Sequence, residues 1–276
     1  MRLAFITNPC DAESHVVLQE LLRAGHDVAA LVTARERRRG KGPWAALLRV
    51  RESRGTFGAI RQVAGLMQRK MRVRMRAVLR SLPLPVACAE ELALQRNIPL
   101  LRPQRLVEPW LAQSIRELSC DLIVVCFCTQ KLPAELLRAA KQGAINLHRS
   151  LLPAYAGPRP VFWALYHGEK ETGVTIHRMV EEIDAGEILA QEKVVISNND
   201  NEASLGRKLL IAGACLMKET LLALEKGAPL PAVRSETKAS YFSRPQRGQV
   251  AELHNRLRRR RAGTPGSGAR CPPRCE

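Results

Sequence analysis

The sequence lacks any long apolar run. The longest stretches, such as Leu122–Cys128, are far shorter than the roughly 20 residues that a transmembrane helix needs. The N-terminus also lacks the basic and then apolar pattern of a secretory signal peptide. We therefore expect a cytoplasmic protein. With 276 residues and 46% apolar content, the chain is long enough for one main globular domain.

Paired cysteines and a glycine-rich nucleotide loop are missing too. The eight cysteines are scattered, form no CxxC unit, and in several cases lie within apolar runs. This spacing argues against a disulfide framework and against a zinc site, so we expect reduced thiols and no metal. The first strand–helix turn has no Gly-x-Gly-x-x-Gly pattern, which argues against a dinucleotide cofactor.

Acidic residues are too few to balance the basic ones, and the formal net charge is +18. The excess lies in two segments, because residues 35–80 carry a net charge of +13 and residues 256–276 carry +6. The rest of the chain is nearly balanced. A nucleic acid that bound across the active face would need positive charge from the nearly neutral part of the chain. We therefore do not expect nucleic acid as the partner.

Strand-like and helix-like segments alternate along the chain, which predicts a parallel sheet covered by helices. We expect an open, doubly wound, mostly parallel α/β sheet with ligands at the carboxyl ends of the strands. One catalytic domain would span residues 1–245, and the Arg-, Gly- and Pro-rich tail at 246–276 would be disordered. The expected strands are Arg2–Thr7, Val28–Thr33, Ile98–Leu101, Asp121–Cys128, Ala144–His148, Gly173–Met179 and Ile188–Ile196; the expected helices begin at Asp11 or Ser14 and cover Ala87–Arg96, Leu106–Leu118, Pro133–Ala140, Pro160–Tyr166 and Ala203–Lys226.

The segment 35–82 is a basic insertion in this pattern. From Phe57 to Leu82, apolar residues recur at steps of three or four while most arginines fall on other faces, so the spacing predicts a basic amphipathic helix. Its apolar stripe could pack on the domain. The same residues 57–82 could instead lie on an anionic membrane surface, which would make the protein peripheral to a membrane, or bind a phosphorylated partner.

Three polar residues carry the clearest chemical signal. Asn146 and His148 are two apart at the end of a predicted strand, so both side chains leave the same face of the sheet. Asp184 follows in a Glu-Glu-Ile-Asp-Ala-Gly turn that could return a carboxylate to the same crevice. An amide and an imidazolium can stabilise a developing oxyanion, and a carboxylate can take a proton from an attacking amine. The pattern therefore indicates acyl transfer to an amine without a covalent enzyme intermediate.

The run around these residues resembles the folate-dependent formyltransferase family. In that family an Asn-x-His is followed by Ser-Leu-Leu-Pro, a Gly and a distal Asp-x-Gly, and here these are Asn146, His148, Ser150–Pro153, Gly157, Asp184 and Gly186. The resemblance implies N10-formyltetrahydrofolate as co-substrate. It implies that the pterin is held by Cys126, Phe127, Cys128, Leu132, Ile183, Ala185, Gly186 and Glu187, and that the acceptor pocket is shaped by Asn8, Ser150, Leu151, Leu152, Pro153, Tyr155 and Gly157.

The departures from the family pattern bear on the acceptor. We expect no tRNA-binding barrel of the kind found in methionyl-tRNA formyltransferases, since few structured residues are predicted after Ser243. A charged residue that is often found in the family's Pro-to-Gly loop is absent here, where Ala154 and Ala156 flank Tyr155. We therefore expect a small amine, such as an amino-sugar nucleotide or an intermediate of specialised biosynthesis. Hydrolysis of the formyl donor, formylation of aminoacyl-tRNA, and a non-catalytic folate- or membrane-binding role stay open, as does a homodimer.

Overall fold

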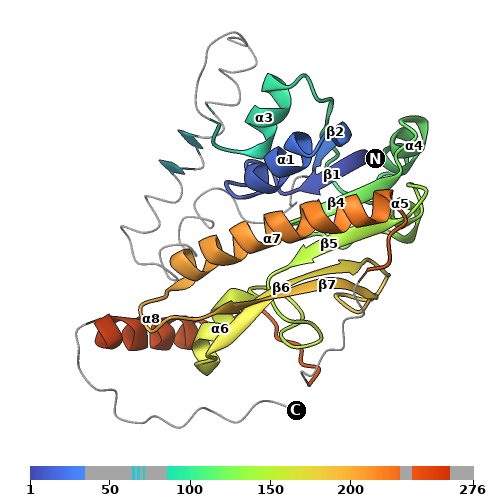
Figure 1. Cartoon of the computed structure of the whole chain (residues 1–276). Helices are drawn as coiled ribbons and strands as arrows, with labels where there is room; N and C mark the ends of the chain where they lie inside the picture. Colours follow the sequence, from blue (N-terminus) through green and yellow to red (C-terminus); the bar gives the residue numbers. More distant parts are fainter. Residues whose placement is uncertain (35–63, 66, 69–70, 72–85, 231–237, 262–276) are drawn as a thin grey trace.

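The protein, seen in a computed structural model, is built on one seven-stranded sheet (Figure 1). The structure describes residues 1–34, 64–65, 67–68, 71, 86–230 and 238–261. The strand order is β3-β2-β1-β4-β5-β6-β7; β1 to β5 run parallel, and β6 and β7 are added antiparallel. The predicted open, mostly parallel sheet is confirmed. The strands are β1 (Arg2–Thr7), β2 (Asp27–Thr33), β3 (Leu100–Leu101), β4 (Leu122–Cys126), β5 (Ala144–His148), β6 (Glu171–Arg178) and β7 (Ile188–Val195).

Helices cover both faces of this sheet, as the alternating pattern predicted. Along β1, Leu3 and Phe5 pack into one apolar core while Ala4 and Ile6 pack into a second, as the two-residue period of a strand requires. The first core includes α1, α3, α6 and α7, and the second includes α4 and α5. The helices are α1 (Ser14–Arg23), α3 (Ala89–Gln95), α4 (Pro109–Glu117), α5 (Ala134–Leu137), α6 (Pro160–His167), α7 (Glu202–Glu225) and α8 (Arg247–Arg261).

The long helix α7 fixes the strand that carries the motif. Asn201 caps its N-terminus by accepting hydrogen bonds from the amides of Ala203 and Ser204, and the Ser204 hydroxyl accepts one from the Asn201 amide. Further along, a Cβ on Gly213 would lie 2.8 Å from a methyl group of Leu147 on β5. The missing side chain therefore lets α7 approach β5 closely.

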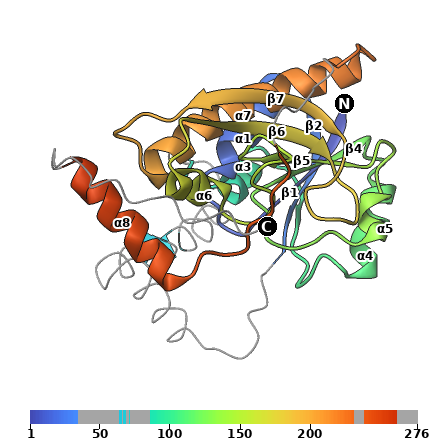
Figure 2. The same cartoon turned by 90° about the horizontal axis from the view of Figure 1, so that it is seen from below.

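The predicted disorder of 246–276 is wrong for its first half, because residues 247–261 form α8. Val250 and Leu253 are buried, and α8 lies beside α6 (Figure 2). The Tyr166 hydroxyl donates a hydrogen bond to Glu252, and Arg256 donates one to the Tyr166 carbonyl. These tertiary contacts stabilise a helix whose composition alone favoured disorder. Residues 262–276 lie outside the described part of the chain.

The predicted amphipathic helix at 57–82 falls almost wholly outside the described residues and stays a prediction. Three members of its apolar stripe are described: Ala64 is exposed, and Met67 and Met71 are 69% and 61% exposed. Among the described residues, no helix is both long enough and apolar enough to cross a membrane.

Candidate active site

The three motif residues lie at the carboxyl ends of the central strands. Asn146 and His148 are on β5, which pairs with β4 on one side and antiparallel with β6 on the other. The β5–β6 register sets Asn146 opposite His177 and His148 opposite Thr175. The pairing therefore brings a second histidine to the motif from a strand that begins more than twenty residues later.

Asp184 reaches this edge from the turn between β6 and β7. Its backbone is left-handed, with φ at 53°, and its Oδ2 accepts a 2.8 Å hydrogen bond from the amide of Gly157. Two residues later, a Cβ on Gly186 would lie only 1.9 Å from the carbonyl oxygen of Arg178. The turn thus needs glycine at 186 to close against β6, and this closure sets the position of the Asp184 carboxylate.

The carboxylate of Asp184 stands between two imidazoles. Its Oδ2 is 3.6 Å from Nδ1 of His148, and its Oδ1 is 3.7 Å from Nε2 of His177. Both distances exceed those of direct hydrogen bonds, so the carboxylate is a close electrostatic neighbour of each ring. The side chains of His148, Asp184 and His177 are 8%, 12% and 2% exposed, which places the group largely out of water.

His177 holds the amide of Asn146. Its Nδ1 lies 2.9 Å from the Arg178 carbonyl, which can only accept, so Nδ1 carries a hydrogen. Burial lowers the pKa of His177, which leaves the ring neutral and Nε2 without a hydrogen at neutral pH. Nε2 therefore accepts the 3.1 Å hydrogen bond from Nδ2 of Asn146. The sequence pattern did not place His177 at the site, because strand register is not visible in the sequence.

His148 is held by the loop that follows β5. Its Nε2 donates a 3.0 Å hydrogen bond to the carbonyl of Tyr155, so Nδ1 is the nitrogen that faces Asp184. Tyr155 is left-handed, with φ at 59°, which is unusual for a bulky residue and needs support. The Tyr155 hydroxyl donates to Glu169, its ring stacks on Phe242 at 5.3 Å, and its amide donates to Ser240. Sequence reasoning missed this support.

The remaining loop residues predicted to shape the acceptor pocket fold over β6. The Ser150 hydroxyl donates to the Ala154 carbonyl, and the Leu152 amide donates to the hydroxyl of Thr175. Pro153 accepts a hydrogen bond from the Ser240 amide. Gly157 has φ at 95°, and a Cβ there would lie 2.5 Å from the Phe242 carbonyl. The loop is thus tied to β6 and to the segment at 240–242.

The residues predicted to hold the pterin lie in two places at the same edge. After β4, the side chains of Cys126 and Leu132 are buried in the core, so only their backbone groups could meet a ligand. Phe127 follows Cys126 with φ at 55°, and Cys128 donates to the Gln130 carbonyl. Nearby, Asn8 at the end of β1 accepts hydrogen bonds from the amide and hydroxyl of Thr129.

The second group follows β6. Ile183 is 56% exposed, Ala185 is exposed, and Glu187 forms an ion pair with Arg178 at 3.2 Å.

Burial raises the pKa of the Cys126 thiol, so this cysteine is a protonated core residue and not a nucleophile. Within the described residues, no group of three or more His, Cys, Asp or Glu is arranged to hold a metal ion.

Comparison with known protein families identifies the class to which this fold and site belong. The family pattern described as formyl transferase matches residues 39–221. The chain belongs to the formyl transferase family.

Two groups of relatives stand out. The chain is 38% identical over 154 residues to the methionyl-tRNA formyltransferase of Staphylococcus aureus and 42% identical over 160 residues to that of Bacillus licheniformis. These matches cover 56% and 58% of this chain, and 50% and 51% of the relatives. The chain thus spans about half the length of the curated relatives it matches.

Solved structures show the same fold. The phosphoribosylglycinamide formyltransferase of Bacillus halodurans aligns with a TM-score of 0.55 at 23% identity, covering 81% of this chain and 95% of that one. A sugar N-formyltransferase from a Shewanella species aligns with a TM-score of 0.56 at 19% identity, covering 88% and 77%.

Proposed function

We propose that the protein transfers a formyl group from N10-formyltetrahydrofolate to the primary amine of a small metabolite. The observation that carries this proposal is the grouping of Asn146, His148 and Asp184 in one largely buried site at the carboxyl edge of the sheet. Direct attack by an amine needs a donor for the oxygen and an acceptor for the proton, and it needs no nucleophilic side chain.

The residues beside Asp184 suit the formyl donor. Val180 and Ile183 in the β6–β7 turn are 42% and 56% exposed, which offers apolar surface to a flat ring system. The backbone of residues 126–128 and 183–187 would supply the polar contacts to its edges. When bound, the folate supplies the formyl group, and the protein supplies orientation and charge.

Asn146 and His148 would stabilise the oxygen that gains negative charge. One hydrogen of the Asn146 Nδ2 group is donated to His177, and the second is left to donate to that oxygen. In the protonated form of His148, the Nδ1 hydrogen faces the same space, because Nε2 is already bonded to Tyr155. Removal of one such donor typically lowers the rate by about 100- to 1,000-fold.

Asp184 would take the proton from the attacking amine and return it to N10 of the folate as the bond between N10 and the formyl carbon breaks. Its Oδ2 is oriented by the Gly157 amide and lies 3.6 Å from Nδ1 of His148. That separation leaves the carboxylate free to accept a proton directly or through one water molecule. General base catalysis of this kind contributes about 100- to 10,000-fold to a rate.

The choice of acceptor rests on the loop beside His148. Relatives are named for three kinds of acceptor, methionyl-tRNA, phosphoribosylglycinamide and sugars. We favour a small amine because the loop that contacts His148 carries Ala154 and Ala156, which add no charge for a polyanion.

The test is turnover of the formyl donor with and without a panel of amines, including amino-sugar nucleotides and charged initiator tRNA. The proteins compared are the wild type, His148→Ala, Asp184→Asn and the control Glu117→Gln, whose side chain is exposed on α4 and bonded to Gln113. We expect amine-dependent deformylation that the first two variants lose and the control keeps.

Other results would contradict the proposal in distinct ways. Formate release at full rate without an amine would identify a hydrolase. Formylation of charged tRNA alone would identify a tRNA enzyme. Tight folate binding without turnover of any amine would identify a binding protein.

A further inference from the structure

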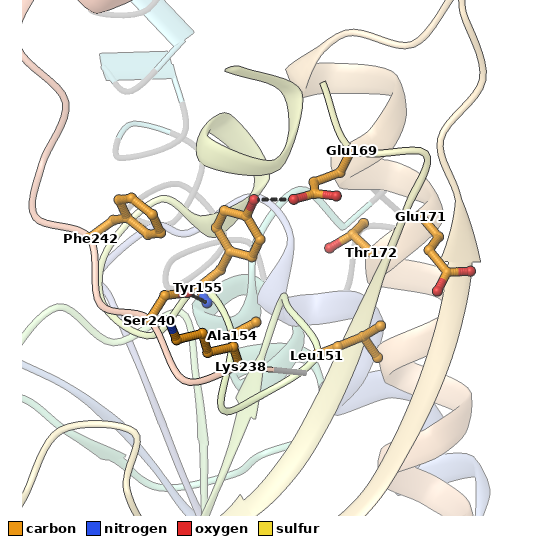
Figure 3. Close-up of a pocket in the computed structure, with 9 residues that line it drawn as sticks. All are labelled: Leu151, Ala154, Tyr155, Glu169, Glu171, Thr172, Lys238, Ser240 and Phe242. Carbon is orange, nitrogen blue, oxygen red and sulfur yellow. Dashed lines mark hydrogen bonds between the residues drawn. The ribbon is translucent and has the colours of Figure 1, made fainter. Parts of the chain in front are cut away.

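Two thiols near the start of the chain are not used by the proposed function. Cys10 follows β1 and is 7% exposed, and Cys88 comes directly before α3 and is 0% exposed. Both are free thiols, and they pack against each other in a small cluster separate from the two main cores. The pocket in Figure 3, by contrast, is lined by Leu151 and Tyr155 of the acceptor loop, and neither thiol belongs to its wall.

The carboxylate of Glu90 on α3 holds Cys10 beside Cys88. Its Oε2 accepts hydrogen bonds from both the amide and the thiol of Cys10, each at 3.1 Å. Its Oε1 accepts a 3.1 Å hydrogen bond from the Thr33 hydroxyl and is paired with Arg102 at 3.4 Å. Because Glu90 is buried and both of its oxygens are engaged, the sulfur of Cys10 has a defined position next to its neighbour.

The two thiols differ in how readily each loses its proton. The hydrogen bond from the Cys10 thiol lowers the pKa of Cys88, and the amide of Glu91 adds to this effect. The same hydrogen bond, together with burial and the Glu90 carboxylate, raises the pKa of Cys10. When the pair loses one proton, the thiolate is therefore at Cys88 and the thiol at Cys10. A thiolate next to a thiol is the combination that forms a disulfide when an oxidant takes two electrons.

We propose that Cys10 and Cys88 are a reversible redox pair, which a peroxide oxidises to a disulfide. The Cys88 thiolate attacks one oxygen of hydrogen peroxide, so that the O–O bond breaks, hydroxide leaves and a sulfenic acid forms. The Cys10 sulfur then attacks the Cys88 sulfur. The S–S bond forms, the S–O bond breaks, and the leaving hydroxide takes the Cys10 proton as water. Overall, two thiols and one peroxide give one disulfide and two waters.

A disulfide here would act on two parts of the chain. The chain between residues 10 and 88, which includes α1, β2 and the basic segment 35–82, would become a closed loop. Closing a long loop stabilises a fold by restricting the unfolded chain. Cys10 is also two residues from Asn8, which accepts a 3.2 Å hydrogen bond from the Thr129 amide. Oxidation would therefore bear on the predicted acceptor pocket, and only this consequence rests on the proposed function.

The experiment is disulfide mapping of the full-length protein before and after treatment with hydrogen peroxide, with free thiols blocked by N-ethylmaleimide. Trypsin leaves the two thiols on separate peptides, 3–23 and 81–96, and neither peptide contains another cysteine. We expect peroxide to join these two peptides with the loss of two hydrogens, and dithiothreitol to release both. Urea unfolding should show a higher midpoint for the oxidised protein than for the reduced one.

Variants test the order of the two steps. In Cys10→Ser the sulfenic acid at Cys88 has no thiol to attack it, so dimedone should trap it there. In Cys88→Ser we expect little or no dimedone adduct on Cys10. Both variants should lose the effect of peroxide on the urea midpoint. The matched control is Cys215→Ser, which removes a partly exposed free thiol on α7 and should keep both the cross-link and the shift in midpoint.

Three outcomes would overturn the proposal: no cross-link between peptides 3–23 and 81–96, a larger yield of a cross-link from either peptide to a third cysteine, or as much dimedone on Cys10 of Cys88→Ser as on Cys88 of Cys10→Ser. The first two are read on the unmodified protein and do not depend on whether a variant folds. Failure of the catalytic proposal would instead appear as absent donor turnover with the cross-link unchanged.

Discussion

The hydrogen bond between Asn146 and His177 gives a quantitative prediction about catalysis. In His177→Leu, the Asn146 amide loses the acceptor that orients it at 3.1 Å. A neutral hydrogen bond of this kind contributes about 0.5–1.5 kcal/mol, which corresponds to a rate loss of roughly two- to twelvefold. The loss should stay below the roughly 100- to 1,000-fold expected for Asn146→Ala, which removes the proposed oxyanion donor itself.

The assay is amine-dependent deformylation of the folate, with kcat and KM measured separately. His177 is 2% exposed, and both of its ring nitrogens are hydrogen-bonded to protein groups, so its ring is not available to the folate. We therefore expect kcat to fall and KM for the folate to change little. The conservative variant His177→Gln keeps a carbonyl acceptor for Asn146 and should recover part of the rate. The double variant His177→Leu/Asn146→Ala should be no slower than Asn146→Ala alone, since the two changes remove the same interaction.

Additive losses in the double variant would refute the reasoning, because His177 would then act independently of Asn146. A loss in His177→Leu equal to that in Asn146→Ala would refute it as well. Urea unfolding of each variant separates these outcomes from a general loss of stability.

Two further predictions concern the turn at 184–186 and the buried histidines. Gly186→Ala places a Cβ 1.9 Å from the Arg178 carbonyl, so the turn must shift, and we expect about 1–3 kcal/mol lower stability in urea and reduced turnover. The control Gly248→Ala has nothing within 4 Å of its Cβ and lies in α8, so it should not lower stability and should leave turnover unchanged. Burial lowers the pKa of His26 and His177, so the unfolded chain binds more protons below about pH 6.5, and the free energy of unfolding should fall as the pH drops from 7.5 to 5.5. Urea titrations should show a smaller fall in His26→Gln; an identical fall would contradict this assignment.

The central strands could be predicted from the sequence because their signals are local. The strand Ala144–His148 has the predicted bounds, and the predicted helix Ala203–Lys226 differs from α7 by one residue at each end. A run of apolar and β-branched residues identifies a buried strand, and the two-residue period then puts Asn146 and His148 on one face.

The partners of the motif could not be predicted, because they depend on which strands become neighbours. His177 contacts Asn146 through the antiparallel β5–β6 register, and nothing local in the sequence fixes that register. Glu169 and Phe242 both contact Tyr155, although they are more than seventy residues apart in the sequence. For α8, composition suggested disorder, whereas Val250 and Leu253 are buried in the core and α8 contacts α6.

Residues 240–242, which follow α7 in the sequence, hold the loop that contacts His148 and Asp184. The Ala156 amide donates to the Ser240 carbonyl at 2.9 Å, and the Phe242 amide donates to the Ala156 carbonyl at 3.0 Å. The loop held in this way supplies the Tyr155 carbonyl to His148 and the Gly157 amide to Asp184. Residues 240–242 lie beyond the family match, which ends at 221. Similarity to the family therefore covers Asn146, His148 and Asp184, while residues 240–242, which hold the loop that contacts His148 and Asp184, lie outside the matched region.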